Sequence, residues 1–140
     1  MNNKNNRGFT LIELMMVVII IGILAAIVVP RFVGQTDKAR RESAKMEIRN
    51  ISMALDRYEM ENGTFPTTEQ GLKALMEKPT SSPVPRDWSG PYLKDEPKDP
   101  WLQLYQYRRP SQNSLDYDIW SWGPDGRDGT ADDISNWKKD

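Results

Sequence analysis

Apolar residues fill the beginning of the chain almost without interruption. From Phe9 to Val29 the only polar residues are Thr10 and Glu13, and no charge follows Glu13 within the segment. A helix of this length spans about 31 Å at about 1.5 Å per residue, close to the hydrocarbon thickness of a bilayer. We therefore expect residues 9–30 to form a transmembrane or assembly helix. The alternative is a buried core helix, but a small domain rarely holds a helix that is apolar on every face.

Helical periodicity continues beyond this segment as one apolar stripe. Its members recur at spacings of three and four residues: Ala44, Ile48, Ile51, Leu55 and Tyr58. This pattern predicts an amphipathic helix that ends at about residue 62, just before Gly63. Met46, Met53 and Met60 repeat every seven residues on a different face. They belong either to a broad core stripe or to a second surface that contacts other protein copies, since methionine adapts to irregular contacts.

The region after the long helix predicts a short helix and an irregular loop. Thr67 and Gln70 have the spacing of a capping box, and Pro79 stands where the helix should end. The apolar face of this helix would consist of Leu72, Leu75 and Met76. Five prolines in residues 81–100 predict a loop without regular structure.

Two strands are expected near the C-terminus. They cover residues of about 104–108 and 115–122, with residues 110–114 as the hairpin turn between them. The expected fold class is therefore α+β, in which a long N-terminal helix packs on a small antiparallel sheet.

Composition restricts the chemistry. The 140 residues carry a formal net charge of −1 and contain neither cysteine nor histidine. Cys/His nucleophiles, a Ser-His-Asp arrangement, the usual zinc ligands and disulfides are therefore excluded. Only carboxylate, lysine or serine chemistry remains for a membrane-anchored enzyme, and we expect no enzyme. No basic patch is interleaved with aromatic residues, so nucleic acid is not an expected partner.

The charges before the apolar segment predict its orientation. Lys4 and Arg7 precede it and no acidic residue lies before Glu13. By the positive-inside rule the N-terminus stays in the cytoplasm and the remainder of the chain crosses the membrane. No small-residue cleavage pattern follows Val29, so the apolar segment is expected to be retained.

The junction between the basic leader and the apolar segment resembles the type III signal of type IV pilins and their relatives. Lys4, Arg7 and Gly8 are followed by Phe-Thr-Leu-Ile-Glu-Leu, residues 9–14. The resemblance implies that a prepilin peptidase cuts between Gly8 and Phe9 and methylates the new N-terminus at Phe9. Residues 1–8 would then be a cleaved leader, and Glu13 would be the glutamate of the family.

Glu13 needs a partner because a charge within a membrane is costly and is generally functional. Cleavage would expose the α-amine of Phe9, which is cationic at neutral pH. In a filament, the amine of one subunit can meet Glu13 of the next and fix the register between them. The alternative is a glutamate that extends to the membrane interface or is protonated there.

Four further blocks resemble the major pseudopilin family of the type II secretion system. They are PTTEQGLKAL (66–75), GPYLKDEPKDPW (90–101), YQYR (105–108) and DIWSWGPDGRDGTADDISNW (118–137). The family usually has Gly-Asn-Pro after the tryptophan, where this chain has Leu102-Gln103-Leu104. This departure leaves open whether the chain turns here or the strand begins earlier.

The resemblance implies a major structural subunit of a periplasmic filament that helps to drive folded exoproteins across the outer membrane. The chain would lie in the inner membrane of a Gram-negative bacterium as a single-pass protein, with residues 31–140 as the periplasmic head. Implied partners are other copies of itself, minor pseudopilins, the prepilin peptidase, membrane lipid, and the inner-membrane assembly platform with its ATPase. The alternatives are a type IV major pilin, which usually carries a C-terminal disulfide, or a minor pseudopilin.

The last block contains an acidic loop. Asp125, Asp128, Asp132 and Asp133 gather around two glycines. Such oxygen ligands on a flexible loop suit Ca²⁺, although the spacing is not that of an EF-hand. The resemblance implies a calcium site made by Asp125, Asp132, Asp133, the carbonyl of Trp122 and a carbonyl from residues 127–130. Asp128 would be a ligand or merely exposed, and a solvated acidic turn is the alternative for the whole loop.

Overall fold

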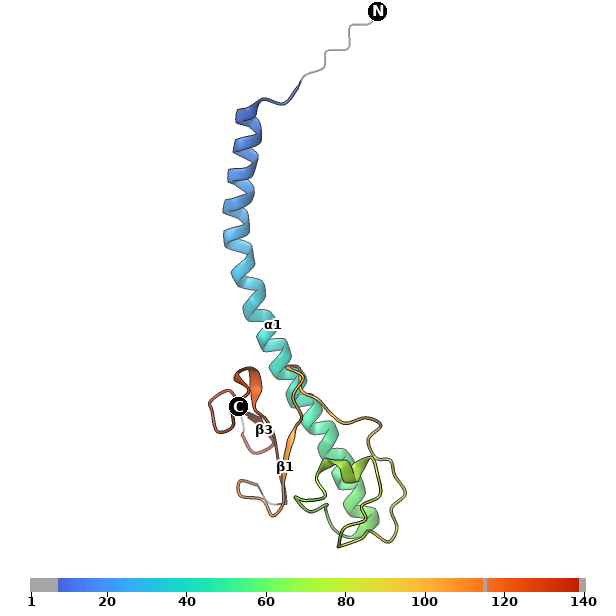
Figure 1. Cartoon of the computed structure of the whole chain (residues 1–140). Helices are drawn as coiled ribbons and strands as arrows, with labels where there is room; N and C mark the ends of the chain where they lie inside the picture. The colour runs from blue at the N-terminus through green and yellow to red at the C-terminus, as the bar shows by residue number, and fades with distance from the viewer. Residues whose placement is uncertain (1–7, 115, 139–140) are drawn as a thin grey trace, which may run out of the picture. The chain divides into compact units, whose positions relative to one another are not determined.

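The computed structural model describes residues 8–114 and 116–138, without the side chains of residues 28–35. The chain divides into two compact units, residues 1–38 and 39–140. Helix α1 (Leu11–Asn62) contributes its first part to one unit and its second part to the other (Figure 1). Lys4 and Arg7, on which the predicted orientation depends, lie outside the described residues.

The first unit contains the N-terminal part of α1. All side chains of residues 8–27 are exposed, including large apolar ones from Val17 at 48% to Phe9 at 89%. The expected helix is therefore present, and within the described residues of this unit no other element covers its apolar surface. Among the residues that the structure describes, no helix combines the length and the hydropathy of a membrane span.

The second unit is built on the remainder of α1, which we call the stem (residues 39–62). The stem ends at Asn62, as the sequence predicts, and Gly63 follows with φ 74°. The five residues of the predicted apolar stripe are all buried, with exposures of 0–3%. Burial of this stripe against the rest of the unit fixes the helix, since amphipathic helices are stabilised mainly by tertiary packing.

The three methionines of the seven-residue repeat lie outside this core. Met46, Met53 and Met60 are 61%, 62% and 83% exposed. The interpretation as a broad core stripe is therefore wrong, because these side chains lie on the face of the stem opposite to the buried stripe. The interpretation as a second contact surface stays a prediction.

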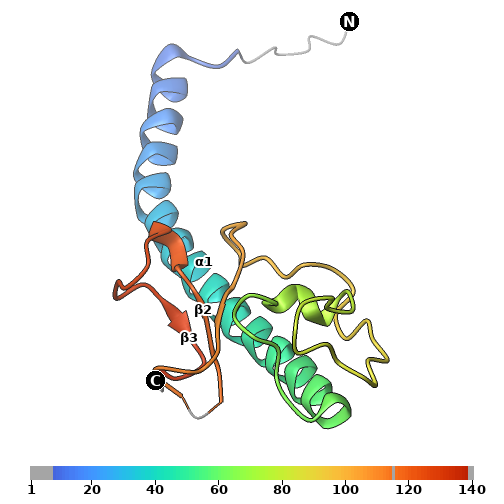
Figure 2. The same cartoon turned by 60° about the horizontal axis from the view of Figure 1, so that its bottom comes forward.

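A three-stranded antiparallel sheet packs along the stem (Figure 2). Its strands are β1 (Gln106–Arg108), β2 (Asp118–Ser121) and β3 (Ile134–Ser135), in the order β1-β2-β3. Four buried residues join the stripe of the stem in the core: Tyr105, Tyr117, Ile119 and Ile134. The α+β architecture expected from the sequence is confirmed.

The strands are shorter than predicted, and one was missed. β1 covers only the end of the predicted 104–108, and β2 the middle of the predicted 115–122, where Leu115 lies outside the described residues. β2 begins at Asp118, later than predicted, because two side-chain groups, Ser114 Oγ and Asn136 Nδ2, donate to the Tyr117 carbonyl. The predicted turn lies in a loop, where Ser111 Oγ and the N–H groups of Gln112 and Asn113 donate to the Asp118 carboxylate. β3 has only two residues, too few to give a periodic pattern.

The short helix after the stem is a 3₁₀ helix, η1 (Leu72–Leu75). The capping box forms as predicted: Thr67 N–H donates to Gln70 Oε1 (3.1 Å), and Gln70 N–H donates to Thr67 Oγ1 (3.2 Å). Gly71, at φ 58°, then separates this capped turn from η1. The helix therefore ends before Pro79, and Met76 is only partly buried.

The chain makes a tight turn over residues 99–103 even though it lacks the glycine of the family. Leu102 N–H donates to the Asp99 carbonyl (2.9 Å), and the Asp99 carboxylate accepts from the N–H groups of Trp101 and Gln103. Leu102 adopts φ 67°, a left-handed conformation that costs about 1–2 kcal/mol for a residue with a Cβ. Residues 102–104, for which the sequence left a turn or an early strand open, therefore form part of a turn, and β1 begins only at Gln106.

Candidate functional site

Glu13 caps the helix in which it lies. Its Oε2 accepts hydrogen bonds from the N–H and the Oγ1 of Thr10, both at 2.9 Å, and Glu13 N–H donates to Thr10 Oγ1 at 3.3 Å. Thr-x-x-Glu is the reciprocal capping box of a helix N-terminus. Within one chain, the carboxylate is therefore held by groups of the first helical turn.

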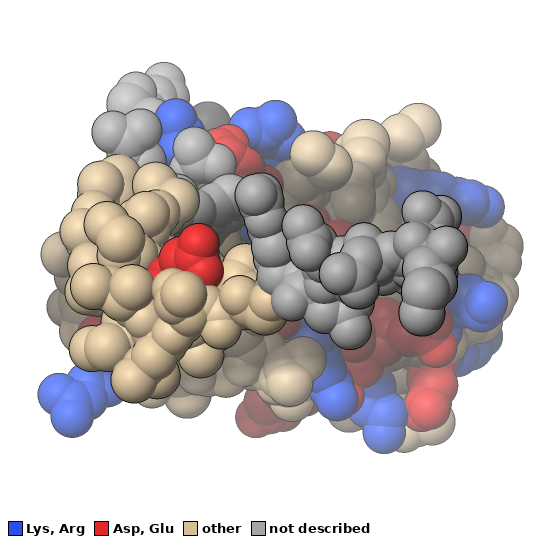
Figure 3. All heavy atoms as spheres, turned by 90° about the horizontal axis from the view of Figure 1, so that it is seen from above, with Lys and Arg blue, Asp and Glu red and all other residues tan. Residues whose placement is uncertain are grey.

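The predicted cleavage and methylation residues lie just before this cap. Gly8 is exposed with open space where a Cβ would stand, and Phe9 is 89% exposed. Both precede the first helical residue, Leu11, so they lie in an exposed segment without regular secondary structure. In Figure 3 the N-terminal end of α1 faces the viewer, and a single red acidic group stands among tan side chains.

The two ends of the acidic loop meet. Gly123 has φ 69°, and a Cβ at this position would collide with the carbonyl of Asp132. This close approach places Gly123, between Trp122 and Asp125 in the sequence, against the backbone of Asp132. The backbone thus joins the beginning of the acidic loop to Asp132, one residue of the predicted calcium set.

Each carboxylate of the loop nevertheless has a protein partner. Asp132 Oδ1 pairs with an Arg41 guanidinium nitrogen at 2.7 Å. Asp133 Oδ2 accepts from the Gly129 N–H at 2.8 Å, and Asp125 Oδ1 accepts from the Arg127 N–H at 3.1 Å. Asp128 is directed elsewhere, since its Oδ1 accepts from the indole N–H of Trp120 at 2.8 Å.

The donor set of the loop fits calcium in its chemistry, because it consists of carboxylate and carbonyl oxygens on a closed loop. In the part of the chain that the structure describes, no three carboxylates gather closely enough to hold a metal ion. Calcium would therefore require Asp132 and Asp133 to exchange their present donors for the ion. The calcium site stays a prediction, with Asp128 the least suited of its residues.

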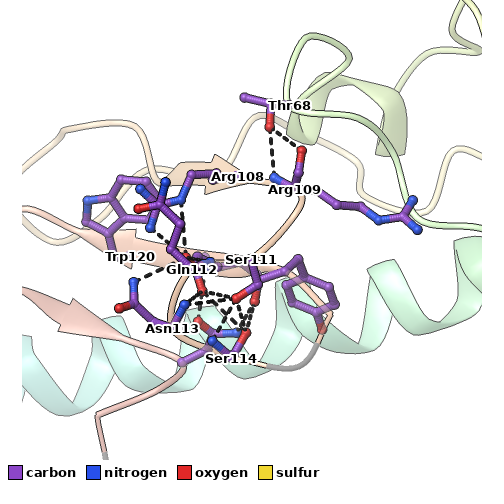
Figure 4. Close-up of polar contacts among 12 residues, drawn as sticks. Thr68, Arg108, Arg109, Ser111, Gln112, Asn113, Ser114 and Trp120 are labelled. Carbon is purple, nitrogen blue, oxygen red and sulfur yellow. Dashed lines mark hydrogen bonds and ion pairs between the residues drawn. The ribbon is translucent and has the colours of Figure 1, made fainter.

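One buried carboxylate, that of Asp118, joins β2 to β1 and to the loop between them. Asp118 is fully buried, and it accepts bonds from Arg108 (2.6 Å), Ser111 (2.6 Å) and the Gln112 N–H (2.9 Å) (Figure 4). Burial alone would raise the pKa of the Asp118 carboxyl. The hydrogen bonds from Ser111, Arg108 and the loop backbone outweigh that effect and hold this pKa well below its usual range.

Sequence reasoning missed three residues that act at these sites. Thr10 was detectable, because it has the same spacing to Glu13 that identified the capping box at Thr67. Arg41 was not, since its pairing with Asp132 joins residues 91 positions apart. Asp118 was not either, because its role depends on how the loop of residues 111–114 folds around it.

Comparison with known proteins agrees with this arrangement. The family described as "Type II secretion system (T2SS), protein G" matches residues 31–137. The family described as "Prokaryotic N-terminal methylation motif" matches residues 3–29. Together the two matches cover the anchor segment and the head.

Individual proteins support the same assignment. The type II secretion system core protein G of Pectobacterium carotovorum subsp. carotovorum is 48% identical over 135 residues, covering 96% of this chain and 86% of that protein. The core protein G of Pseudomonas aeruginosa is 46% identical over 141 residues, covering 98% and 99%. The crystal structure of the major pseudopilin from the type 2 secretion system of enterohaemorrhagic Escherichia coli is 45% identical, with a TM-score of 0.69, covering 74% of this chain and 87% of that one. The resemblance seen in the sequence blocks is confirmed: the chain belongs to the type II secretion system protein G family.

Proposed function

We propose that the chain is the major structural subunit of a type II secretion pseudopilus, a periplasmic filament that helps to move folded exoproteins across the outer membrane. The observation that carries this proposal is the apolar surface of residues 9–27, which is exposed on every side and has one carboxylate at its head. Such a surface needs either lipid or other copies of the helix around it. Membership of the protein G family supports assembly over catalysis.

Deletion with complementation tests this function. We expect exoproteins to accumulate in the periplasm of the deletion strain and to be secreted again when the intact gene is restored. Overexpression should produce periplasmic fibres. A deletion strain that secretes normally but loses adhesion or twitching would instead indicate a type IV pilin.

Maturation and topology follow from the methylation motif as parts of the same proposal. The prepilin peptidase would remove residues 1–8 and methylate Phe9, leaving residues 9–30 as the inner-membrane helix and residues 31–140 as the periplasmic head. The exposed Gly8–Phe9 segment supports access by a peptidase. Mass spectrometry of the purified chain should find an N-methylated Phe9, and an intact leader would contradict the assignment.

Assembly would depend on Glu13. In one chain its partners are the hydroxyl and N–H of Thr10. In the filament, the cationic amine of Phe9 from another copy would add a charged partner and set the register. The minor pseudopilins would be partners in this polymerisation, and the ATPase of the assembly platform would provide its energy. Before a subunit joins the filament, membrane lipid would surround its N-terminal helix.

Calcium would stabilise the head at the acidic loop. Asp125, Asp132, Asp133 and the carbonyl of Trp122 would hold the ion, which would neutralise charges that otherwise repel one another. A ligand bound only by the folded state adds about 2.7 kcal/mol at a hundredfold excess over its Kd.

A chelator tests the calcium proposal. EGTA should lower the melting temperature of the full-length chain in detergent, and Asp125→Asn should abolish this effect. Asp116→Asn alters an exposed acid outside the loop and should leave the effect intact. An unchanged melting temperature of the wild-type chain would contradict the calcium site.

A further inference from the structure

Two large apolar side chains of the head are exposed to solvent over more than four-fifths of their surface. Leu102 is 82% exposed and Met60 is 83% exposed. Val84, near Met60, is 51% exposed. These residues lie in two places, which are considered in turn.

Leu102 stands at the tip of the turn over residues 99–103. Its φ of 67° places a branched side chain in a left-handed backbone conformation. Two hydrogen bonds to the Asp99 carboxylate fix the turn on either side of it. A residue that is both strained and exposed, on a well-held turn, is best explained by a contact outside the chain.

The turn that carries Leu102 lies close in space to the first residues of the stem. The side chain of Gln103 packs against Gly126 in the acidic loop, since a Cβ at Gly126 would stand 2.7 Å from Gln103 Nε2. Asp132 of the same loop binds Arg41. The turn, the acidic loop and Arg41 therefore form one end of the head.

Met60 and Val84 line a groove at the other end of the stem. The groove has a volume of about 460 Å³ and runs between residues 60–64 and the proline-rich segment 83–87. Its wall is held because Glu61 Oε2 accepts from Ser89 Oγ and Tyr92 Oη, both at 2.5 Å. The helix from Arg41 to Asn62 rises by about 31 Å, at about 1.5 Å per residue, so the groove and Leu102 lie at opposite ends of the head.

We propose that Leu102 of one copy inserts into the Met60–Val84 groove of a second copy. The contact joins two different surfaces, so it repeats from copy to copy and builds an open filament instead of a closed dimer. The two surfaces each carry one acid and one base, so opposite charges can meet across the contact. Arg86 and Asp87 line the groove. Asp125 and Arg127 are exposed beside the turn. The proposal rests on the filament function and names one surface through which the heads would meet.

Engineered disulfides test the contact directly, because the chain contains no cysteine. The full-length double variant Leu102→Cys/Val84→Cys, oxidised within filaments, should give a ladder of reducible multimers. Each single variant, oxidised in the same way, should run as a monomer on a non-reducing gel. The double variant Leu102→Cys/Asp116→Cys, with its second cysteine at an exposed position outside the groove, is the matched control and should give no ladder. Intact filaments without a ladder, or dimers from Leu102→Cys alone, would overturn the contact.

A glycine substitution separates this role from a structural one. Leu102→Gly relieves the backbone strain and removes the side chain, so it should raise the thermal midpoint of the chain and lower the filament yield several-fold. Leu102→Met should retain filaments. Wild-type yield from Leu102→Gly would overturn the contact alone, whereas a wild-type chain that forms no filaments would overturn the proposed function and the contact together.

Discussion

Glu13 and Asp118 are both carboxylates that accept several hydrogen bonds, but their surroundings differ. Asp118 is fully buried and receives an arginine, two serine hydroxyls and loop N–H groups from its own chain. Among residues 8–114 and 116–138, the Glu13 carboxylate bonds to Thr10 alone, on a helix whose apolar side chains are exposed. The head therefore supplies the partners of its buried carboxylate from its own chain, whereas the apolar surface around Glu13 is left exposed.

Removal of the Glu13 carboxylate should have the largest effect. Glu13→Ala should leave processing intact and abolish filaments, because no group remains to pair with the amine of Phe9 in a neighbouring copy. Electron microscopy of fibres from overexpressing cells is the measurement. Glu42→Ala removes an exposed acid from the stem and should assemble normally. Filaments of wild-type yield from Glu13→Ala would contradict this role.

Removal of the Asp118 carboxylate should instead affect the stability of a single chain. Asp118→Ala leaves the Arg108 guanidinium without its ion pair, and breaking a buried pair costs about 3–5 kcal/mol. Urea unfolding of the full-length chain in detergent measures this loss. Asp116→Ala, at an exposed neighbour, should change the free energy of unfolding by less than about 0.5 kcal/mol. Equal effects of the two substitutions would contradict the organising role of Asp118.

Acid should reveal the same carboxylate. The pKa of Asp118 is lowered in the folded chain, so its contribution to stability is fully present above the unfolded value of about 3.9 and is lost as the pH falls towards the folded pKa. The free energy of unfolding of the wild type should therefore fall more steeply below about pH 4 than that of Asp118→Asn. Parallel curves for the two proteins would exclude this linkage.

The exposed pair between Arg41 and Asp132 should contribute least. Both side chains are more than one-third exposed, and pairs of this kind contribute about 0–1 kcal/mol. Arg41→Gln should thus lower the thermal midpoint only slightly in EGTA. With calcium present its effect should vanish, since the ion would then hold Asp132. A large loss in both conditions would show that the pair, and not calcium, closes the loop.

The sequence predicted the parts of the fold that depend on periodicity. The stem, its buried stripe and its end at Asn62 follow from spacing and from Gly63, and each is confirmed. The predicted start of β2 was wrong because the carbonyl of Tyr117 bonds to the side chains of Ser114 and Asn136, and this depends on tertiary contacts that local spacing does not show. The turn at Leu102 was left open because its conformation depends on hydrogen bonds to Asp99 and not on local preference.

The candidate site was predictable where chemistry is local. The glycine–phenylalanine junction and Glu13 were recognised from consecutive residues, and Thr10 could have been added by the capping-box spacing. The acidic loop was recognised from its composition. The ion pair between Asp132 of this loop and Arg41 could not be predicted, because it joins the loop to a helix that is distant in sequence.

The most direct test of the account is a reconstruction of the assembled filament at side-chain resolution. The account predicts that the Glu13 carboxylate lies within hydrogen-bonding distance, about 2.7–3.2 Å, of the α-amine of Phe9 from another copy, with residues 11–27 buried among neighbouring helices. A filament in which Glu13 contacts only Thr10 of its own chain, or in which these helices face solvent, would contradict it.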